Sequence, residues 1–388
     1  MSFATQKTLD ARVLDDFEDC SPTVIAPNSI GPTMSPSDYL FSVCEETFGK
    51  SIGEGGFANV FEGPTGIVTK AMVVSPEQVL GNEFDLKDLG PDLREVGLGY
   101  RNGAGLQLLR ESGFETSVNL KTNDRRRLGL FMNGVRQMWI FGHSSENQGL
   151  LPYLERKFYL FDGVLLATVG TTKAKGSCLS ENLDSSAPGN VYSAKDILNI
   201  AVGTSYLLDY HFHSRRIIHG DVKPENLFYD PFNIEDRSLN RGVTLLDYDT
   251  SWGEGLLSGP FRTNDEEDFL QDYLSLVQLS GTLRAMSPEL LIHGAKTKFA
   301  DYFALGVTLG ELITGRSVKE PTLSAFDLDK VESLSPQYHQ FVAERAYQVG
   351  LPSDFICSLL KMYHPNPNCR DMKNLHYHAE KALKHLDS

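Results

Sequence analysis

A glycine-rich segment and a lysine that follows it have residue types that could bind a phosphate. Gly53 and Gly55 stand between two strand-like segments, where backbone N–H groups can approach an anion because glycine has no Cβ. Lys70 follows in the apolar segment 67–72. A glycine-rich hairpin turn explains the glycines equally well, and a solvated edge charge explains Lys70 better than an anion ligand does. These residues alone therefore do not establish a phosphate site.

The segment 217–228 is much more specific. It carries Asp221, Lys223 and Asn226 within the run His-Gly-Asp-Val-Lys-Pro-Glu-Asn. With the glycine-rich segment and Lys70 upstream, the chain resembles the eukaryotic-type protein kinases, whose catalytic loop begins with an H-R-D motif and ends with an asparagine.

Further kinase motifs follow in the family order. Asp247-Tyr248-Asp249 resembles the D-F-G motif, and Ser287-Pro288-Glu289 resembles the A-P-E motif. Asp301 and Gly306 are similar to a D-x-W-x-x-G motif, and Arg370 suits the arginine that pairs with the A-P-E glutamate. The resemblance extends over about residues 48–386. Ordered agreement of this kind is not expected by chance.

The resemblance implies a catalytic role for several matched residues. Lys70 would hold the α- and β-phosphates of ATP, and Asn226 and Asp247 would hold Mg²⁺. Asp221 would accept the proton of the attacking hydroxyl. Lys223 would contact the γ-phosphate, and a lysine at this position is typical of Ser/Thr kinases. The implied cofactors are ATP and Mg²⁺, and the implied substrate is a protein.

The resemblance also assigns the remaining ATP-binding residues. Gly53 and Gly55 would lie over the phosphates. Val60 and Val68 would cover the adenine from one side, with Phe228 on the other side. Ordinary core packing would explain the last three residues equally well.

Three positions depart from the family pattern. Gly220 replaces the H-R-D arginine, Asp249 replaces the D-F-G glycine, and Ala58 replaces the third glycine of the glycine-rich loop. We expect Asp249 to place a second carboxylate near the metal. Because Gly220 cannot anchor a phosphate, phosphorylation of the segment 247–289 is not expected to be required for activity. A regulatory protein partner or an insertion would then set the active geometry.

The interval between Lys70 and Asp221 is longer than is usual in the family, which predicts an insertion within residues 73–157. The insertion obscures the helix glutamate that pairs with the lysine. Glu95 is our preferred partner, and Glu83 and Glu111 are alternatives. Glycines that follow Glu95 weaken a helix there.

Hydrophobic periodicity predicts an α+β fold with two lobes. Strands are expected at 48–53, 58–62 and 67–72, and a hairpin at 158–169. These antiparallel strands form a strand-rich first lobe, and the resemblance implies that residues 45–170 are a kinase N-lobe. Helix signals dominate residues 171–388, the expected C-lobe.

Two helix boundaries in the C-lobe can be predicted from cap residues. Ser193 and Asp196 form a capping-box pattern before an apolar periodic segment. Asp301 is expected to cap a buried helix that runs to Thr314 and ends at Gly315. Residues 1–44 are rich in Ser, Pro and Thr and are expected to form a disordered tail.

Composition excludes several classes of protein. The chain of 388 residues has 36 basic and 51 acidic side chains, a net charge of −15, so no global positive field exists to attract nucleic acid. No apolar run is long enough for a membrane span, and the N-terminus shows no signal peptide. Five cysteines without a C-x-x-C pair favour a reducing compartment. We therefore expect a cytoplasmic protein, or one delivered into the cytosol of a host cell.

Two functions fit these observations. The preferred one is a Ser/Thr protein kinase that transfers the ATP γ-phosphate to protein hydroxyls. The alternative is a pseudokinase scaffold that binds nucleotide or a partner without efficient catalysis, which the departures at Gly220 and Asp249 favour. A small-molecule kinase is disfavoured because it would not need the Ser-Pro-Glu segment as a peptide platform.

Overall fold

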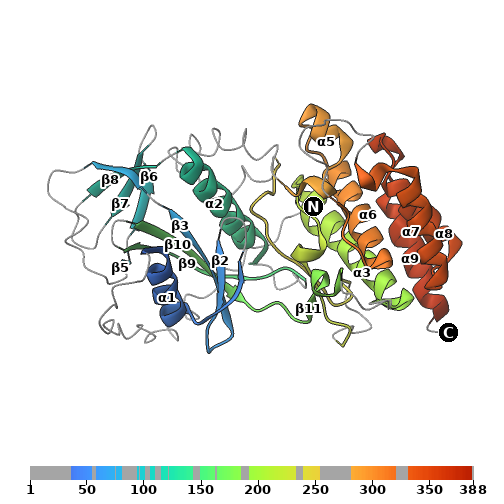
Figure 1. The fold of residues 1–388 in the computed structure, drawn as a ribbon, viewed down its shortest axis with the longest axis horizontal. Coiled ribbons are helices and arrows are strands. Elements are labelled where there is room, and N and C mark those ends of the chain that lie inside the picture. Colours follow the sequence, from blue (N-terminus) through green and yellow to red (C-terminus); the bar gives the residue numbers. More distant parts are fainter. Residues whose placement is uncertain are drawn as a thin grey trace, which may run out of the picture.

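The computed structural model describes fourteen segments of the chain, and everything below concerns these residues. They are residues 36–54, 58–74, 76–80, 94–95, 97–100, 105–109, 115–120, 122–142, 149–161, 164–184, 192–232, 239–253, 281–319 and 331–386. The strand-rich part and the helical part of the chain form two lobes, as Figure 1 shows. The predicted α+β, two-lobed fold is confirmed.

A six-stranded antiparallel sheet forms the centre of the N-lobe, in the order β1-β2-β3-β10-β9-β5. Strands β1, β2 and β3 and the antiparallel pair β9–β10 correspond to the expected strands and hairpin, but β1 begins at Lys50 because Phe48 ends the preceding helix. The turn residues 162–163 lie outside the described segments. The bounds are β1 Lys50–Glu54, β2 Asn59–Glu62, β3 Ile67–Val74, β9 Tyr153–Phe161, β10 Val164–Thr172 and β5 Arg94–Glu95. Strand β3 pairs with β10, so that Lys70 lies opposite Val169. The sheet thus holds Lys70 in a central strand.

Two helices cover opposite faces of this sheet. Successive residues in a strand point to opposite faces. Met72, on the same face as Lys70, packs with helix α2 (Thr122–Gly142). Ala71 faces the other way and packs with helix α1 (Pro36–Phe48) through Leu40 and Cys44.

Helix α1 differs from the sequence expectation. Its first nine residues belong to the segment 1–44, which we expected to be a disordered tail, whereas Leu40 and Cys44 are buried at 6% and 3% exposure. Their partners, such as Phe61, lie on the sheet, and local composition cannot reveal contacts of that kind. Residues 1–35 lie outside the described segments.

Strands from the expected insertion form a second sheet. It has the order β4-β8-β7-β6, and Figure 1 shows it at the end of the N-lobe away from the helical lobe. The bounds are β4 Pro76–Leu80, β6 Gly97–Tyr100, β7 Gly105–Leu109 and β8 Glu115–Leu120. Helix α2 follows directly, so chain from within 73–157 supplies both this sheet and the helix that packs near Lys70.

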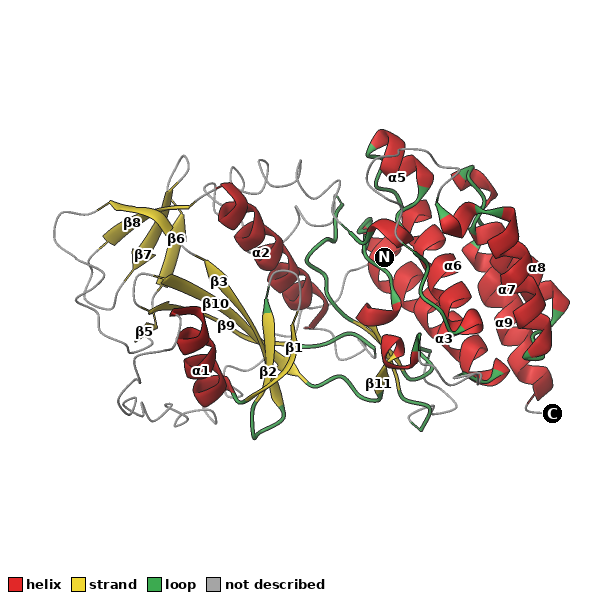
Figure 2. Cartoon of the chain, in the orientation of Figure 1, coloured by secondary structure: helices red, strands yellow, loops and turns green. Residues whose placement is uncertain are grey.

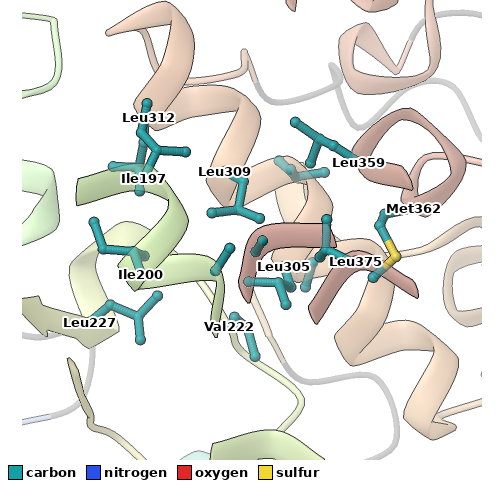
Figure 3. Packing of buried hydrophobic residues seen from close by; sticks show 14 of the residues in the cluster. Ile197, Ile200, Val222, Leu227, Leu305, Leu309, Leu312, Leu359, Met362 and Leu375 are labelled. Carbon is teal, nitrogen blue, oxygen red and sulfur yellow. The ribbon is translucent and has the colours of Figure 1, made fainter. Parts of the chain in front are cut away.

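The C-lobe is mostly helical, as Figure 2 shows. Its helices are α3 Ala194–Tyr206, α5 Pro288–His293, α6 Lys298–Thr314, α7 Pro336–Gln348, α8 Ser353–Met362 and α9 Met372–Leu386. A π-helical turn, Leu207–Phe212, continues α3, and a small sheet joins β11 (Ser177–Cys178), β12 (Leu227–Tyr229) and β13 (Val243–Leu245). Buried apolar side chains from α3, α6, α8 and α9 meet in one core, part of which Figure 3 shows.

The cap residues predicted for the C-lobe are partly right. Ser193 forms the expected capping box with Asp196, and Gly315 ends α6 with a φ of 68°. The prediction that Asp301 caps α6 is wrong, because the helix already begins at Lys298. The Asp301 side chain is buried at 1% exposure and instead contacts the segment 217–228, which we call the catalytic loop by its resemblance to that of kinases.

No helix within the described segments is long and apolar enough to span a membrane.

Candidate active site

The backbone of the catalytic loop is anchored by Asp301 of α6. Its carboxylate accepts the backbone N–H of His219 at 2.9 Å and of Gly220 at 2.8 Å, and it also contacts His213 Nε2 at 2.9 Å. Burial opposes its charged form, but His213 and these donors outweigh burial and lower the pKa of Asp301. An ionised carboxylate thereby fixes the loop that presents Asp221.

The predicted catalytic residues of the loop contact one another. Asp221 Oδ2 lies 2.8 Å from Lys223 Nζ, and Asn226 Nδ2 donates to the carbonyl and to Oδ2 of Asp221 at 2.8 and 3.1 Å. Thr282 lies near the end of the segment 247–289. It donates its backbone N–H to Asp221 Oδ1 at 2.7 Å, and its hydroxyl accepts a hydrogen bond from Lys223 Nζ at 2.8 Å. This network holds carboxylate, ammonium and amide groups in one place.

Lys70 reaches across from the N-lobe to the segment that follows β13. Its Nζ lies 2.8 Å from Asp247 Oδ1 and 2.6 Å from Asp249 Oδ2. Leu246 donates its N–H to the carbonyl of Asn226 at 2.8 Å, which keeps Asp247 next to the catalytic loop. The structure thus brings Lys70, Asn226 and Asp247 to the same region between the lobes.

The two carboxylates around Lys70 differ in protonation tendency. Burial opposes the charged form of Lys70, but Asp247 and Asp249 outweigh it and raise the pKa of the lysine. Burial is also the largest influence on Asp249, and it raises the pKa of this carboxyl to about 7 against the opposing effect of Lys70. The pKa of Asp247 is lowered because Lys70 outweighs its burial.

Helix α2 packs directly against the D-Y-D segment. Asn133, which is buried, donates from Nδ2 to the carbonyls of Asp249 and Ser251 at 2.9 and 2.7 Å. A Cβ added to Gly134 would lie 1.9 Å from Asp249 Oδ1, so only glycine fits there. At the end of the helix, Phe141 packs on Tyr248 with ring centroids 5.9 Å apart. Helix α2 therefore holds both Asp249 and Tyr248.

The prediction that Glu95 lies on the helix beside Lys70 is wrong. Glu95 belongs to strand β5, where it pairs with Tyr159 of β9 at the edge of the sheet. Glycines just beyond it disfavour a helix, and the strand pairing provides backbone hydrogen bonds instead. The alternatives Glu83 and Glu111 lie outside the described segments.

The predicted adenine-contacting residues come from both lobes. Val60 lies on β2 and Val68 on β3 of the N-lobe, and Phe228 lies on β12 of the C-lobe. Val68 is buried, and Val60 and Phe228 are half-buried. Gly53 lies on β1, opposite Val60, and Gly55 is outside the described segments.

A buried lysine occupies the space beside Gly220. A Cβ at this position would lie 2.2 Å from Lys296 Cε, and the backbone φ of 82° also favours glycine. Lys296 is 4% exposed and donates to the carbonyl of Thr250 at 2.6 Å. Burial lowers its pKa to about 8. A cation from outside the catalytic loop therefore stands next to the position where the family has its arginine.

The predicted contact between Arg370 and Glu289 is present as a bidentate ion pair. Its two N–O distances are 2.6 and 3.0 Å, and the Arg370 side chain is fully buried. This pair ties helix α5, which begins just before Glu289, to the chain preceding α9.

Sequence reasoning missed four residues that shape the site. They are Thr282, Asn133, Gly134 and Lys296, and no sequence signal pointed to a role of any of them in the site. Each acts through a contact with a residue far away in the chain. An asparagine followed by a glycine within a helix is the one local anomaly that could have drawn attention to α2, because neither residue favours a helix.

The chain is similar to known protein kinases. It matches the protein kinase domain over residues 181–385, just over half of its length. A probable serine/threonine-protein kinase of Dictyostelium discoideum is 26% identical over 136 residues, which are 35% of this chain and 25% of that protein. Rhodopsin kinase of Homo sapiens is 37% identical over 108 residues, covering 27% and 15%.

A serine/threonine-protein kinase of Saccharomyces cerevisiae is 27% identical over 158 residues, covering 41% of this chain and 18% of that protein. The matched stretches thus span a quarter or less of these three relatives. The domain match, the two-lobed fold and the ordered motifs agree, and the chain belongs to the protein kinase family.

Proposed function

We propose that this protein is an active Ser/Thr kinase that transfers the γ-phosphate of Mg-ATP to protein hydroxyls. The observation that carries the proposal is the network around Asp221. Lys223, Asn226 and Thr282 all contact this aspartate at hydrogen-bonding distance. Phosphoryl transfer depends mainly on positioning and charge stabilisation, and such a network supplies both.

Each residue of the network has a step to perform. Asp221 accepts the proton of the substrate hydroxyl as that oxygen attacks phosphorus, and Lys223 stabilises negative charge on the transferred phosphoryl group. Lys70 holds the α- and β-phosphates. Thr282 positions Asp221 through its backbone N–H, because that bond leaves the carboxylate little freedom to rotate.

The donor set next to Asp221 fits Mg²⁺. Asp247 is 37% exposed at its side chain, so its carboxylate is accessible. The Nδ2 of Asn226 is engaged by Asp221, which leaves the amide oxygen as the ligand atom. Both are hard oxygen donors of the kind that Mg²⁺ prefers. When bound, Mg²⁺ would neutralise charge on the nucleotide phosphates.

The test is a phosphoryl-transfer assay with labelled ATP, Mg²⁺ and a mixture of proteins, followed by identification of the phosphorylated residue type. We expect phosphoserine and phosphothreonine. Asp221→Asn should slow transfer by about 10²- to 10⁴-fold while nucleotide binding survives, because only the proton acceptor is lost. Asp247→Asn should also weaken Mg-ATP binding.

Glu62→Gln is a matched control. It removes a carboxylate from an exposed ion pair with Lys173 on the N-lobe sheet, 2.9 Å long, and should leave transfer unchanged. Nucleotide binding without transfer in the wild-type protein would favour the pseudokinase scaffold instead. Equal transfer by the wild-type, Asp221→Asn and Asp247→Asn proteins would refute the proposed roles.

A further inference from the structure

We propose that Asp249 is the lasting ion-pair partner of Lys70. It replaces the helix glutamate that pairs with the corresponding lysine in other kinases. Helix α2 then acts on Lys70 through Asp249. The catalytic consequence of this inference rests on the proposed function, whereas the pairing itself does not. Asp249 is therefore a positioning residue, since it acts on the nucleotide only through Lys70.

The composition of helix α2, which packs beside Lys70, supports this pairing. Along its whole described length, Thr122–Gly142, helix α2 contains no glutamate, and Asp124 in its first turn is its only acid. Gly134 of this helix lies against the Asp249 side chain. Its missing side chain leaves the space that Asp249 fills, because a Cβ there would lie 1.9 Å from Asp249 Oδ1. The Asp249 carboxylate comes from the chain that follows β13, yet it occupies the place where a side chain at position 134 would begin.

The two carboxylates that contact Lys70, those of Asp247 and Asp249, differ in exposure. The Asp247 side chain is 37% exposed and the Asp249 side chain 10% exposed, although both contact Lys70 Nζ. Asp247 can therefore turn to a metal ion in the accessible region. Asp249 is enclosed by α2 and stays with the lysine.

Hydrogen bonds fix the backbone at and beyond Asp249. Asn133 Nδ2 donates to its carbonyl at 2.9 Å and to that of Ser251 at 2.7 Å. Further along, Trp252 exchanges two backbone hydrogen bonds with Ile218 of the catalytic loop. Asp249 is thus held both by α2 and by the segment that contacts Ile218, and it connects the helix to Lys70.

These contacts also revise the expectation that Asp249 serves as a second metal carboxylate. Its Oδ2 is 2.6 Å from Lys70 Nζ, and its Oδ1 faces Gly134. Both oxygens are thus directed toward the lysine and the helix. Asp249→Gly should accordingly change nucleotide binding more than the dependence on Mg²⁺ concentration.

The decisive experiment moves the carboxylate back to the helix. Asp249→Gly should lower kcat/KM for ATP by about 10- to 100-fold, the effect of losing a hydrogen bond to a charged group. Gly134→Glu alone should also be harmful, because the new side chain collides with Asp249. The double variant D249G/G134E should recover at least about tenfold of the lost kcat/KM, since the glutamate then reaches Lys70 from the usual side. A merely structural role of Asp249 would give no such rescue.

A second measurement does not depend on catalysis. Unfolding by urea of Lys70→Met, Asp249→Asn and the double variant should show a coupling of at least about tenfold in the unfolding equilibrium constant. Glu62→Gln with Lys173→Met is the matched control, an exposed pair whose coupling should stay below about fivefold.

The outcomes separate the two proposals. If the wild-type protein transfers no phosphate, the proposed function fails, and the coupling between Lys70 and Asp249 still tests the pairing. Absence of coupling in folded variants would overturn the inference. So would Asp249→Gly with wild-type ATP kinetics, or with only a shifted Mg²⁺ titration, which would assign Asp249 to the metal.

Discussion

The ion pair between Arg370 and Glu289 should be essential for the stability of the C-lobe. Arg370→Met removes a fully buried guanidinium that donates to both oxygens of Glu289 and to the carbonyls of Phe299 and His364. Methionine retains most of the apolar stem, which isolates the loss of charge and hydrogen bonds. The change therefore leaves a carboxylate and at least two carbonyls without their donor.

The magnitude follows from this environment. Breaking a buried ion pair on one side costs about 3–5 kcal/mol, because the remaining charge stays buried without compensation. Glu289 is 11% exposed at its side chain, so water relieves little of that penalty. We expect Arg370→Met to lower the free energy of unfolding by about 3–4 kcal/mol.

The assay is urea unfolding followed by tryptophan fluorescence and far-UV circular dichroism. Glu289→Gln should be milder, because Arg370 keeps its backbone carbonyl partners. The double variant should lose less than the sum of the single losses. A loss below about 1 kcal/mol for Arg370→Met, the value typical of an exposed pair, would refute this account of the site.

Three further predictions concern the C-lobe. Gly220→Ala should destabilise the protein by about 1–3 kcal/mol in urea unfolding, because φ is 82° and the Cβ meets Lys296; Lys296→Met in the same protein should relieve part of the loss, and an unchanged stability would contradict the prediction. Burial lowers the pKa of His211 to about 4 from 6.5, so the unfolded chain binds the proton first as the pH falls. Stability should decline between these pH values by up to about 3 kcal/mol, and His211→Gln should remove that slope in pH-dependent unfolding. Ser193→Ala should cost about 1 kcal/mol through loss of the capping box, measured as a lower unfolding midpoint, while Asp196→Asn should cost less.

Local signals in the sequence predicted the elements of the fold well. Short strand-like runs bounded by turn residues located β2, β3 and the β9–β10 hairpin, and Ser193 located the start of α3. These signals act through neighbouring residues, because turn conformations and helix caps depend on a few consecutive positions. The same reasoning failed at Glu95, where pairing with β9 determines the structure.

The residues of the candidate active site could be identified from the sequence because they lie close together in the chain or in recognisable motifs. Asp221, Lys223 and Asn226 occur within one loop, and in the structure Lys223 and Asn226 both contact Asp221. Arg370 and Glu289 are 81 positions apart, yet each carries its own motif, and their predicted contact is present.

The sequence by itself determined the family, the order of the lobes and the residues that we propose for phosphoryl transfer. Only the tertiary structure showed that Asp249 contacts Lys70 beside Asp247, since Asp249 lies 179 positions away and fills the space left by Gly134. Only the tertiary structure likewise showed that Lys296 lies beside Gly220 and that the Asp301 carboxylate accepts a hydrogen bond from the backbone of the catalytic loop. The physical reason is the same in each case: a side chain's partner is set by the packing of distant elements, whereas its own conformational preference is set by its neighbours in the chain.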